Sequence, residues 1–346
     1  MSLQIYNQDL GIIGILAQSA PQEYTDCLTF TGETSDFTLK ATYKEWNGIV
    51  EYSTDHNTWK VWDGTEISSV DKKLYLRGSG NRTFRTSYGA RFSLSALAGC
   101  SGNLNTLLEY SNPPTTLSAS SCYRFMFYNC ANLTTAPELP ATTLTDSCYE
   151  YMFQGCTSLK TAPALPATTL TTYCYDAMFK GCTSLTTAPA LPATALTTYG
   201  YSSMFYGCTN LTTAPALPAT ALANSCYDSM FKGCTSLAAA PALPATTLAQ
   251  YCYSNMFEGC TSLTAAPALP ATTLETQCYA FMFRDCTSLK VSSIKTGAYQ
   301  YAWRIPTSGT ISSEPTGWNL KMLTNTGGTF TSDPSINTTY YGAWMK

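Results

Sequence analysis

Charged side chains are scarce in this sequence. They make up 12% of its 346 residues, about half of the roughly 25% that is usual in globular proteins. The 19 basic and 22 acidic side chains leave a formal net charge of −3. The chain therefore has no basic surplus with which to neutralise phosphates, and we expect no nucleic-acid partner.

Histidine is almost absent, since His56 is the only one. A zinc site built on several histidines, or a Ser-His-Asp triad, is therefore not expected. His56 follows Asp55 in a segment typical of a turn, and we interpret it as a solvated loop residue. The sequence also contains no Cys-x-x-Cys pair. We predict no catalytic residue, no metal, no cofactor and no enzymatic activity.

Long apolar runs are missing as well, so we expect no transmembrane segment. The short run 10–17 is apolar, but no Lys or Arg precedes it and Asp9 adjoins it, so we interpret it as something other than a signal peptide. We predict that residues 1–23 form an anchor or assembly segment. It would contact a virion or sister subunits, and we expect a homo-oligomer.

Cysteine, in contrast, recurs with a period of 26 residues. Each unit follows the frame Cys-Tyr-x-x-Met-Phe-x-Gly-Cys-x-x-Leu, with Gly200 in place of one first cysteine. A period of this length with columns of leucine is typical of a leucine-rich repeat solenoid. The second cysteine column consists of Cys130, Cys156, Cys182, Cys208, Cys234, Cys260 and Cys286.

The frame predicts a short helix in each unit. Cys148, Met152 and Cys156 are spaced four apart and would share one helical face over about residues 147–154. Gly155 stands where a left-handed residue would end that helix. The following Ala-Pro-Ala-Leu-Pro segment is the candidate inner strand. Because its two prolines lack N–H donors, we expect only two or three ladder residues per unit.

The repeat cysteines have a structural interpretation. Two cysteines eight residues apart on a helix are about 12 Å apart, beyond the reach of a disulfide. Cysteines of neighbouring coils are in register, but their side chains point the same way. We therefore interpret the cysteines as small core hydrophobes, and buried reduced thiols are compatible with a reducing cytoplasm.

The two ends of the chain differ from the repeats. Residues 24–92 contain short strand-like segments between turn residues and predict a small β-sandwich domain. Residues 93–295 form the predicted solenoid, which starts with an imperfect repeat. Residues 296–346 predict a degenerate capping repeat. The predicted fold class is a mixed α/β solenoid of leucine-rich repeats with an N-terminal all-β, sandwich-like domain.

The repeat frame resembles the BspA-like leucine-rich repeats of Bacteroides-type surface proteins. In that family the core is usually Ala-Phe-x-x-Cys-x-x-Leu, whereas this chain has Met-Phe and a longer unit. The resemblance covers roughly residues 95–345, and the N-terminal segment is similar to the β-domain that often precedes such arrays. It implies adhesion and host contact, and the family also occurs in phage proteins.

Two sets of residues are candidates for binding. Trp46, Trp59 and Trp62 could form an aromatic platform for sugars, or they could be the core of the sandwich. Within the repeats the inner-face position is Glu138 once and then always alanine, whereas one exposed column varies, and a binding array would use that ridge. The ridge consists of Gln154, Lys180, Tyr206, Lys232, Glu258 and Arg284.

These observations predict a non-enzymatic structural or binding protein. The first setting is a bacteriophage virion surface protein, such as a head or tail fibre, assembled in the host cytoplasm. Its solenoid rod would then serve attachment to a host-surface protein or glycan. The alternative is a secreted bacterial cell-surface adhesin of the BspA type that binds a host protein or glycan. If the array itself does not bind, it is a rigid spacer and recognition lies at one end.

Overall fold

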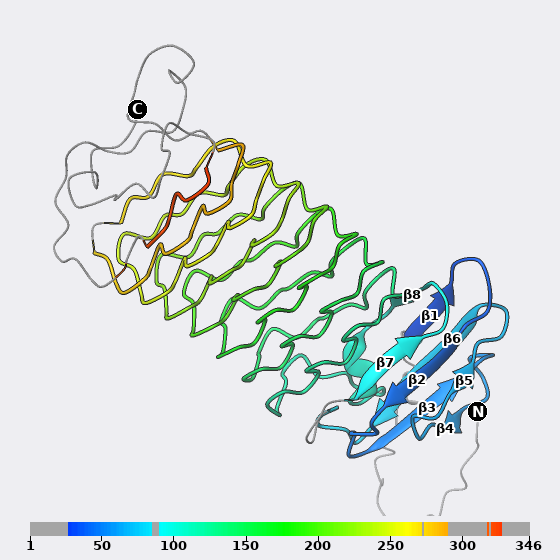
Figure 1. Ribbon diagram of the computed structural model, residues 1–346. Coiled ribbons are helices and arrows are strands. Elements are labelled where there is room, and N and C mark those ends of the chain that lie inside the picture. The colour runs from blue at the N-terminus through cyan, green and yellow to red at the C-terminus, as the bar shows by residue number, and fades with distance from the viewer. Residues whose placement is uncertain (1–26, 85–89, 272, 290–316, 318–319, 327–346) are drawn as a thin grey trace, which may run out of the picture.

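The computed structural model describes residues 27–84, 90–271, 273–289, 317 and 320–326. The predicted N-terminal segment 1–23 and most of the predicted cap lie outside these residues. A β-domain occupies one end, and a rod of stacked coils extends from it (Figure 1). Buried side chains of the two parts form one continuous hydrophobic core.

The β-domain contains two antiparallel sheets. The five-stranded sheet has the order β4 (Lys60–Val61), β3 (Ile49–Ser53), β6 (Lys73–Ser79), β1 (Leu28–Gly32), β8 (Ala98–Ser101). The three-stranded sheet has the order β5 (Ile67–Ser68), β2 (Thr38–Thr42), β7 (Arg91–Leu94). The strands extend to Ser101, so the boundary predicted at residue 92 falls inside β7.

Alternation of apolar and polar residues explains which sides of the strands are buried. Phe30 on β1 and Leu74 and Leu76 on β6 face inward and are fully buried, while their neighbours along each strand face outward. Leu39 on β2 and Phe92 on β7 belong to the same core. The outward side of the five-stranded sheet is therefore the side on which polar and aromatic residues gather.

The predicted helices are wrong. Among the described residues the only helix is a 3₁₀-helix, η1 (Leu104–Leu107). In residues 147–156, each even-numbered N–H donates to the carbonyl three residues earlier, as from Met152 to Tyr149 (3.1 Å). Each odd-numbered N–H donates to the next coil, as from Phe153 to Met178 (2.9 Å). Alternate backbone groups therefore bond within the coil and between coils.

The period of this segment is four residues, not the 3.6 residues of a helix. A left-handed residue recurs at every fourth position, at Ser147 (φ 57°), Tyr151 (φ 57°) and Gly155 (φ 74°). Each left-handed residue turns the chain, so that the pairs between them point inward and are buried. The left-handed conformation predicted for Gly155 is confirmed, although it ends no helix.

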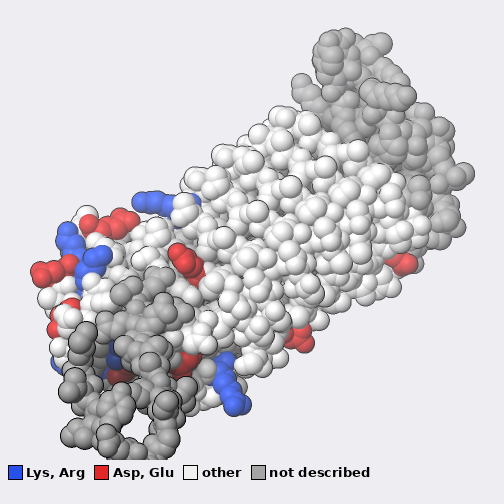
Figure 2. All heavy atoms as spheres, turned by 180° about the vertical axis from the view of Figure 1, so that it is seen from behind, with Lys and Arg blue, Asp and Glu red and all other residues white. Residues whose placement is uncertain are grey.

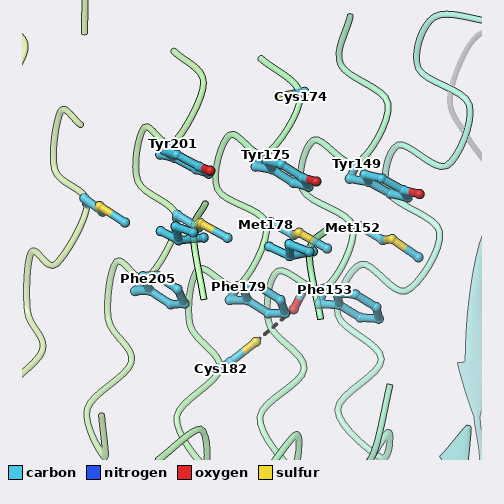
Figure 3. Packing of buried hydrophobic residues seen from close by; sticks show 14 of the residues in the cluster. Tyr149, Met152, Phe153, Cys174, Tyr175, Met178, Phe179, Cys182, Tyr201 and Phe205 are labelled. Carbon is cyan, nitrogen blue, oxygen red and sulfur yellow. Dashed lines mark hydrogen bonds between the residues drawn. The ribbon is translucent and has the colours of Figure 1, made fainter. Parts of the chain in front are cut away.

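The inward pairs form aromatic ladders along the rod (Figure 3). Tyr149 and Tyr175 stack with ring centroids 5.8 Å apart, and Phe153 and Phe179 stack at 5.6 Å. The same stacking continues from Tyr123 to Tyr279 and from Phe127 to Phe283. Each stacked pair contributes about 0.5–1.5 kcal/mol beyond its buried area.

The predicted inner strand is not formed. Single parallel bridges connect neighbouring coils at Thr161–Thr187 and at Ala195–Ala221, on either side of the Ala-Pro-Ala-Leu-Pro segment. The prolines provide no N–H for a ladder within the segment itself. Leu165 nevertheless points inward and is 4% exposed, as predicted.

The β-domain closes the N-terminal end of the rod by making contacts with the first coil like those that a preceding coil would make. The N–H groups of Phe84 and Phe92 donate to carbonyls of the first coil at 2.8 and 2.6 Å. The Phe84 ring stacks on Tyr123 at 5.9 Å, and the Phe92 ring meets Phe127 edge-on at 5.6 Å. Both aromatic ladders therefore begin inside the β-domain.

At the other end, residues 320–324 continue the backbone bonding. Phe283 donates to the carbonyl of Met322 at 3.0 Å, and Asp285 donates to Thr324 at 2.9 Å. Met322 and Leu323 are buried, in the positions that methionine and phenylalanine occupy in the preceding coils.

The left-handed glycine column generates a stability prediction. A Cβ at Gly207 would meet nothing closer than 3.9 Å, so Gly207→Ala adds only the cost of a left-handed alanine, about 1 kcal/mol. Gly207→Asn should cost less, because Asn129 adopts the same conformation in the first coil. Gly155→Ala should cost more than Gly207→Ala, because its Cβ would collide with Oδ1 of Asn129. Denaturant unfolding measures all three, and equal losses for alanine and asparagine would contradict this.

Candidate binding surfaces

From Lys180 to Arg284 the side chains of the predicted ridge pair with one another, whereas Oε1 of Gln154 has no hydrogen-bond partner among the described residues. The Lys180 ammonium lies 4.6 Å from the centroid of the Tyr206 ring, and Lys232 lies 5.7 Å from the same ring. Glu258 pairs with Lys232 at 3.0 Å and also with Arg284. Glu258 is 6% exposed, so this carboxylate is part of the packing between coils rather than an exposed group.

A second polar row runs beside the ridge, four positions earlier in each coil. Glu150 is buried and pairs with Arg124 at 2.8 Å. Burial raises the pKa of Asp176 to about 6, although a hydrogen bond from Ser202 partly opposes the shift. Burial raises the pKa of Asp228 to about 6 in the same way, two coils further along.

The Ala-Pro-Ala-Leu-Pro segments form a different face. Hollows of about 330, 370 and 460 Å³ lie between neighbouring coils. Alanine, proline and leucine line all three, for example Ala216, Pro218, Ala242 and Pro244. No polar side chain lines these hollows, so only backbone groups are present to orient a ligand.

The rod also has few charges on its surface. One face of the molecule shows charged side chains gathered over the β-domain and only isolated ones along the coils (Figure 2). Since the column of exposed alanines after Glu138 is identical in every coil, this part of the rod offers the same small side chain at each step. A partner would find little on it to distinguish one coil from another.

The predicted sugar platform of three tryptophans is wrong for Trp46 and Trp62, which instead belong to the core of the domain. Trp62 is 1% exposed and Trp46 is 7% exposed, and their rings stack 5.4 Å apart in the core. The indole N–H of Trp62 donates to the carbonyl of Thr65 at 2.7 Å. These rings hold the domain together and present no face to a sugar.

Trp59 instead belongs to a half-buried cluster on the outer side of the five-stranded sheet. The Arg77 guanidinium packs against two rings, 4.1 Å from the centroid of Trp59 and 4.4 Å from that of Tyr110. Arg77 also pairs with Glu51 across β3 and β6 at 2.7 Å. We refer to Glu51, His56, Trp59, Tyr75, Arg77 and Tyr110 as the outer cluster.

His56 lies in the loop between β3 and β4, as predicted, but it is half-buried because its ring packs against two others. Its ring lies 4.8 Å from that of Tyr75 and 5.9 Å from that of Trp59. The turn that carries it is organised by Asp55, whose carboxylate accepts from the backbone N–H groups of Asn57 (2.9 Å) and Thr58 (2.7 Å). These hydrogen bonds hold the pKa of Asp55 well below its usual range. The ionised carboxylate thus fixes the turn that positions Trp59.

Sequence reasoning missed Tyr75, Arg77 and Tyr110. Glu51 and Arg77 carry opposite charges at outward positions of two strands, and this pattern could have predicted that they pair. Tyr110 follows η1 and reaches the sheet through the backbone bond from its N–H to Gly78 (2.9 Å). No pattern in the local sequence predicts such a contact.

All fifteen cysteines fall within the described residues, and all are free and buried. The second cysteine of each unit is more than a small hydrophobe. The Cys182 thiol donates to the carbonyl of Phe153 in the preceding coil at 3.1 Å (Figure 3). The same carbonyl accepts the N–H of Cys156. The column therefore adds a side-chain hydrogen bond between coils to those that the backbone already makes.

The described residues contain neither a metal site nor a membrane-spanning helix. They contain no group of three or more His, Cys, Asp or Glu side chains arranged to hold a metal ion. No helix among them is both long and apolar enough to cross a bilayer.

The thiols generate a chemical prediction. Burial raises the pKa of Cys174 and of Cys208 to about 12, so the reactive thiolate is rare at pH 8. Ellman's reagent should therefore modify almost none of the thiols in the native protein and all fifteen after unfolding in guanidinium chloride. Rapid reaction of several thiols in the folded protein would contradict the burial of the columns.

Asp176 and Asp228 generate a pH prediction. Their folded pKa of about 6 exceeds the ordinary value of 3.8, so their contribution to stability is fully present below pH 4 and is lost as pH rises through 6. Between pH 7.5 and 5 the wild type should gain about 1.4 kcal/mol per carboxyl. The Asp176→Asn/Asp228→Asn variant should lack this gain in urea unfolding. An identical pH dependence in both proteins would refute the assignment.

Comparison with known proteins agrees with the repeat geometry. The family of the BspA type leucine-rich repeat region matches residues 106–212 and 201–302, in six copies. No curated protein and no solved structure matches the chain significantly. Proteins with such repeats are generally of a binding or adhesion type and typically non-enzymatic. The matched residues cover more than half of the sequence and, as far as residue 289, include the stacked coils, and the chain belongs to the BspA-type leucine-rich repeat family.

Proposed function

We propose that this protein is a non-enzymatic attachment protein in which the coils are a rigid spacer and the β-domain recognises the partner. The contrast between the two parts supports this assignment. The ridge of the rod pairs internally, through Glu258 with Lys232 and Arg284, and the hollows between coils lack polar side chains. The β-domain carries the outer cluster, where aromatic and charged side chains meet at a half-exposed surface.

The setting that we propose is the surface of a bacteriophage virion, with a host-surface protein or glycan as the target. Fifteen buried free thiols support folding in a reducing cytoplasm, where virions assemble. In this setting the segment 1–23 would attach the protein to the particle or to sister subunits. The alternative is a bacterial cell-surface or secreted adhesin, which the family's adhesion character supports.

The spacer role has a direct test, because one coil can be removed without disturbing the register. Deletion of residues 209–234 takes out one period of 26 residues and joins equivalent positions. We expect the shortened protein to bind susceptible cells with an affinity within about twofold of the full chain, measured by flow cytometry. Charge reversal at Lys180 and Lys232 should have an equally small effect. A tenfold loss in either variant would show that the rod itself recognises the partner.

The proposal that the protein belongs to a virion is tested separately, by determining which particle or cell fraction contains it. Mass spectrometry of purified virions should detect it together with the capsid and tail proteins. Its recovery only from the envelope fraction of uninfected bacteria would overturn the virion setting and support the adhesin.

A further inference from the structure

The outer side of the five-stranded sheet presents a donor and an acceptor at fixed positions. Glu51 and Arg77 are directly opposite each other on β3 and β6. Their hydrogen bond joins Oε2 of Glu51 to Nε of Arg77 at 2.7 Å. It leaves Oε1 of Glu51 and the terminal nitrogens of Arg77 without a hydrogen bond in the described part of the chain. Their side chains are 26% and 23% exposed, so a ligand can reach them.

The pair is held rigidly by its surroundings. The Trp59 and Tyr110 rings both pack against the guanidinium and restrict its movement, and the salt bridge to Glu51 restricts it further. The Asp55 turn fixes the approach of Trp59. A rigid donor and acceptor lose little conformational entropy when they bind, which favours recognition of a small ligand.

Aromatic surface surrounds this polar pair. Trp59, Tyr75 and His56 are half-exposed and pack against one another beside Arg77. Flat rings provide contact area for the C–H faces of a sugar, while adjacent polar groups bind its hydroxyls. The combination of ring faces with a neighbouring donor and acceptor is therefore suited to a ligand that is apolar on one face and hydroxylated at its edge.

We propose that the outer cluster is a binding site for a neutral saccharide. One hydroxyl of a vicinal diol would donate to Oε1 of Glu51, and its neighbour would accept from a terminal N–H of Arg77. The C–H face of the sugar ring would lie against Trp59. This inference rests on the proposed function, since it names the ligand class of the β-domain.

Charge favours a neutral ligand over an acidic one. Glu51 already neutralises Arg77, so a ligand carboxylate would gain little from the guanidinium and would be repelled by the nearby carboxylate. Sialylated or uronic-acid glycans are therefore predicted to bind more weakly than neutral glycans of the same size. A protein partner is the other outcome that the experiment distinguishes.

The experiment is a glycan array probed with the full chain, followed by calorimetric titration with the neutral oligosaccharide that gives the strongest signal. We expect binding to neutral glucose-, galactose-, mannose- or N-acetylglucosamine-containing glycans in preference to sialylated ones. Trp59→Ala and Glu51→Gln should each weaken binding at least tenfold. Tyr251→Ala removes an exposed aromatic ring from the rod and is the matched control, with unchanged affinity expected.

Thermal unfolding of each variant is the control that shows whether the variant is folded. If Trp59→Ala lowers the melting temperature strongly, Trp59→Phe, which keeps a ring, and Glu51→Gln, which keeps the shape of the side chain, decide the outcome. No retained neutral glycan, or equal binding by Glu51→Gln and wild type, overturns the saccharide site. Cell attachment that survives Trp59→Ala and Glu51→Gln points to a protein partner elsewhere and leaves the attachment function intact. Loss of attachment on deletion of residues 209–234 instead refutes the spacer arrangement.

Discussion

The rod depends on satisfying the backbone hydrogen bonds of coils whose described residues form neither helices nor strands. In each coil alternate N–H groups bond within the coil, and the others bond to the next coil. A buried N–H without a partner costs about 1–3 kcal/mol, so no coil is stable without its successor. The bonding pattern therefore requires a stack, and the stack requires a closing element at each end.

The identity of the repeats follows from that requirement. Because coils stack in register, each side chain lies directly over its own copy, and a flat ring is well accommodated by another flat ring. The Tyr149 and Phe153 ladders meet this condition from coil to coil, with rings that are nearly parallel. The thiol of Cys182 adds a hydrogen bond to the preceding coil within the remaining space. Variation is tolerated mainly at outward positions, and even there Lys232 and Glu258 pair along the rod.

The β-domain combines closure of the rod with a chemically varied outer surface. Phe84 and Phe92 provide the first step of each ladder, so the domain and the first coil share a core. The outer face of its five-stranded sheet takes no part in closing the rod, and Glu51, Trp59 and Arg77 come together on that face. A rod that holds such a face at a fixed distance is suited to attachment, which is the basis of the proposed function.

The sequence alone determined the period, the repeat family, the buried columns and the left-handed glycines, because identical units must place identical residues in identical environments. It could not distinguish a four-residue turn period from a helix, because Cys148, Met152 and Cys156 are four apart in both. Bonding between coils decided in favour of turns, and that bonding joins residues 25 positions apart. The outer cluster was equally hidden, because Arg77 meets Trp59 and Tyr110 only after the sheet has formed. Local pattern therefore fixed which residues are buried, whereas contacts distant in sequence decided the backbone conformation and the site.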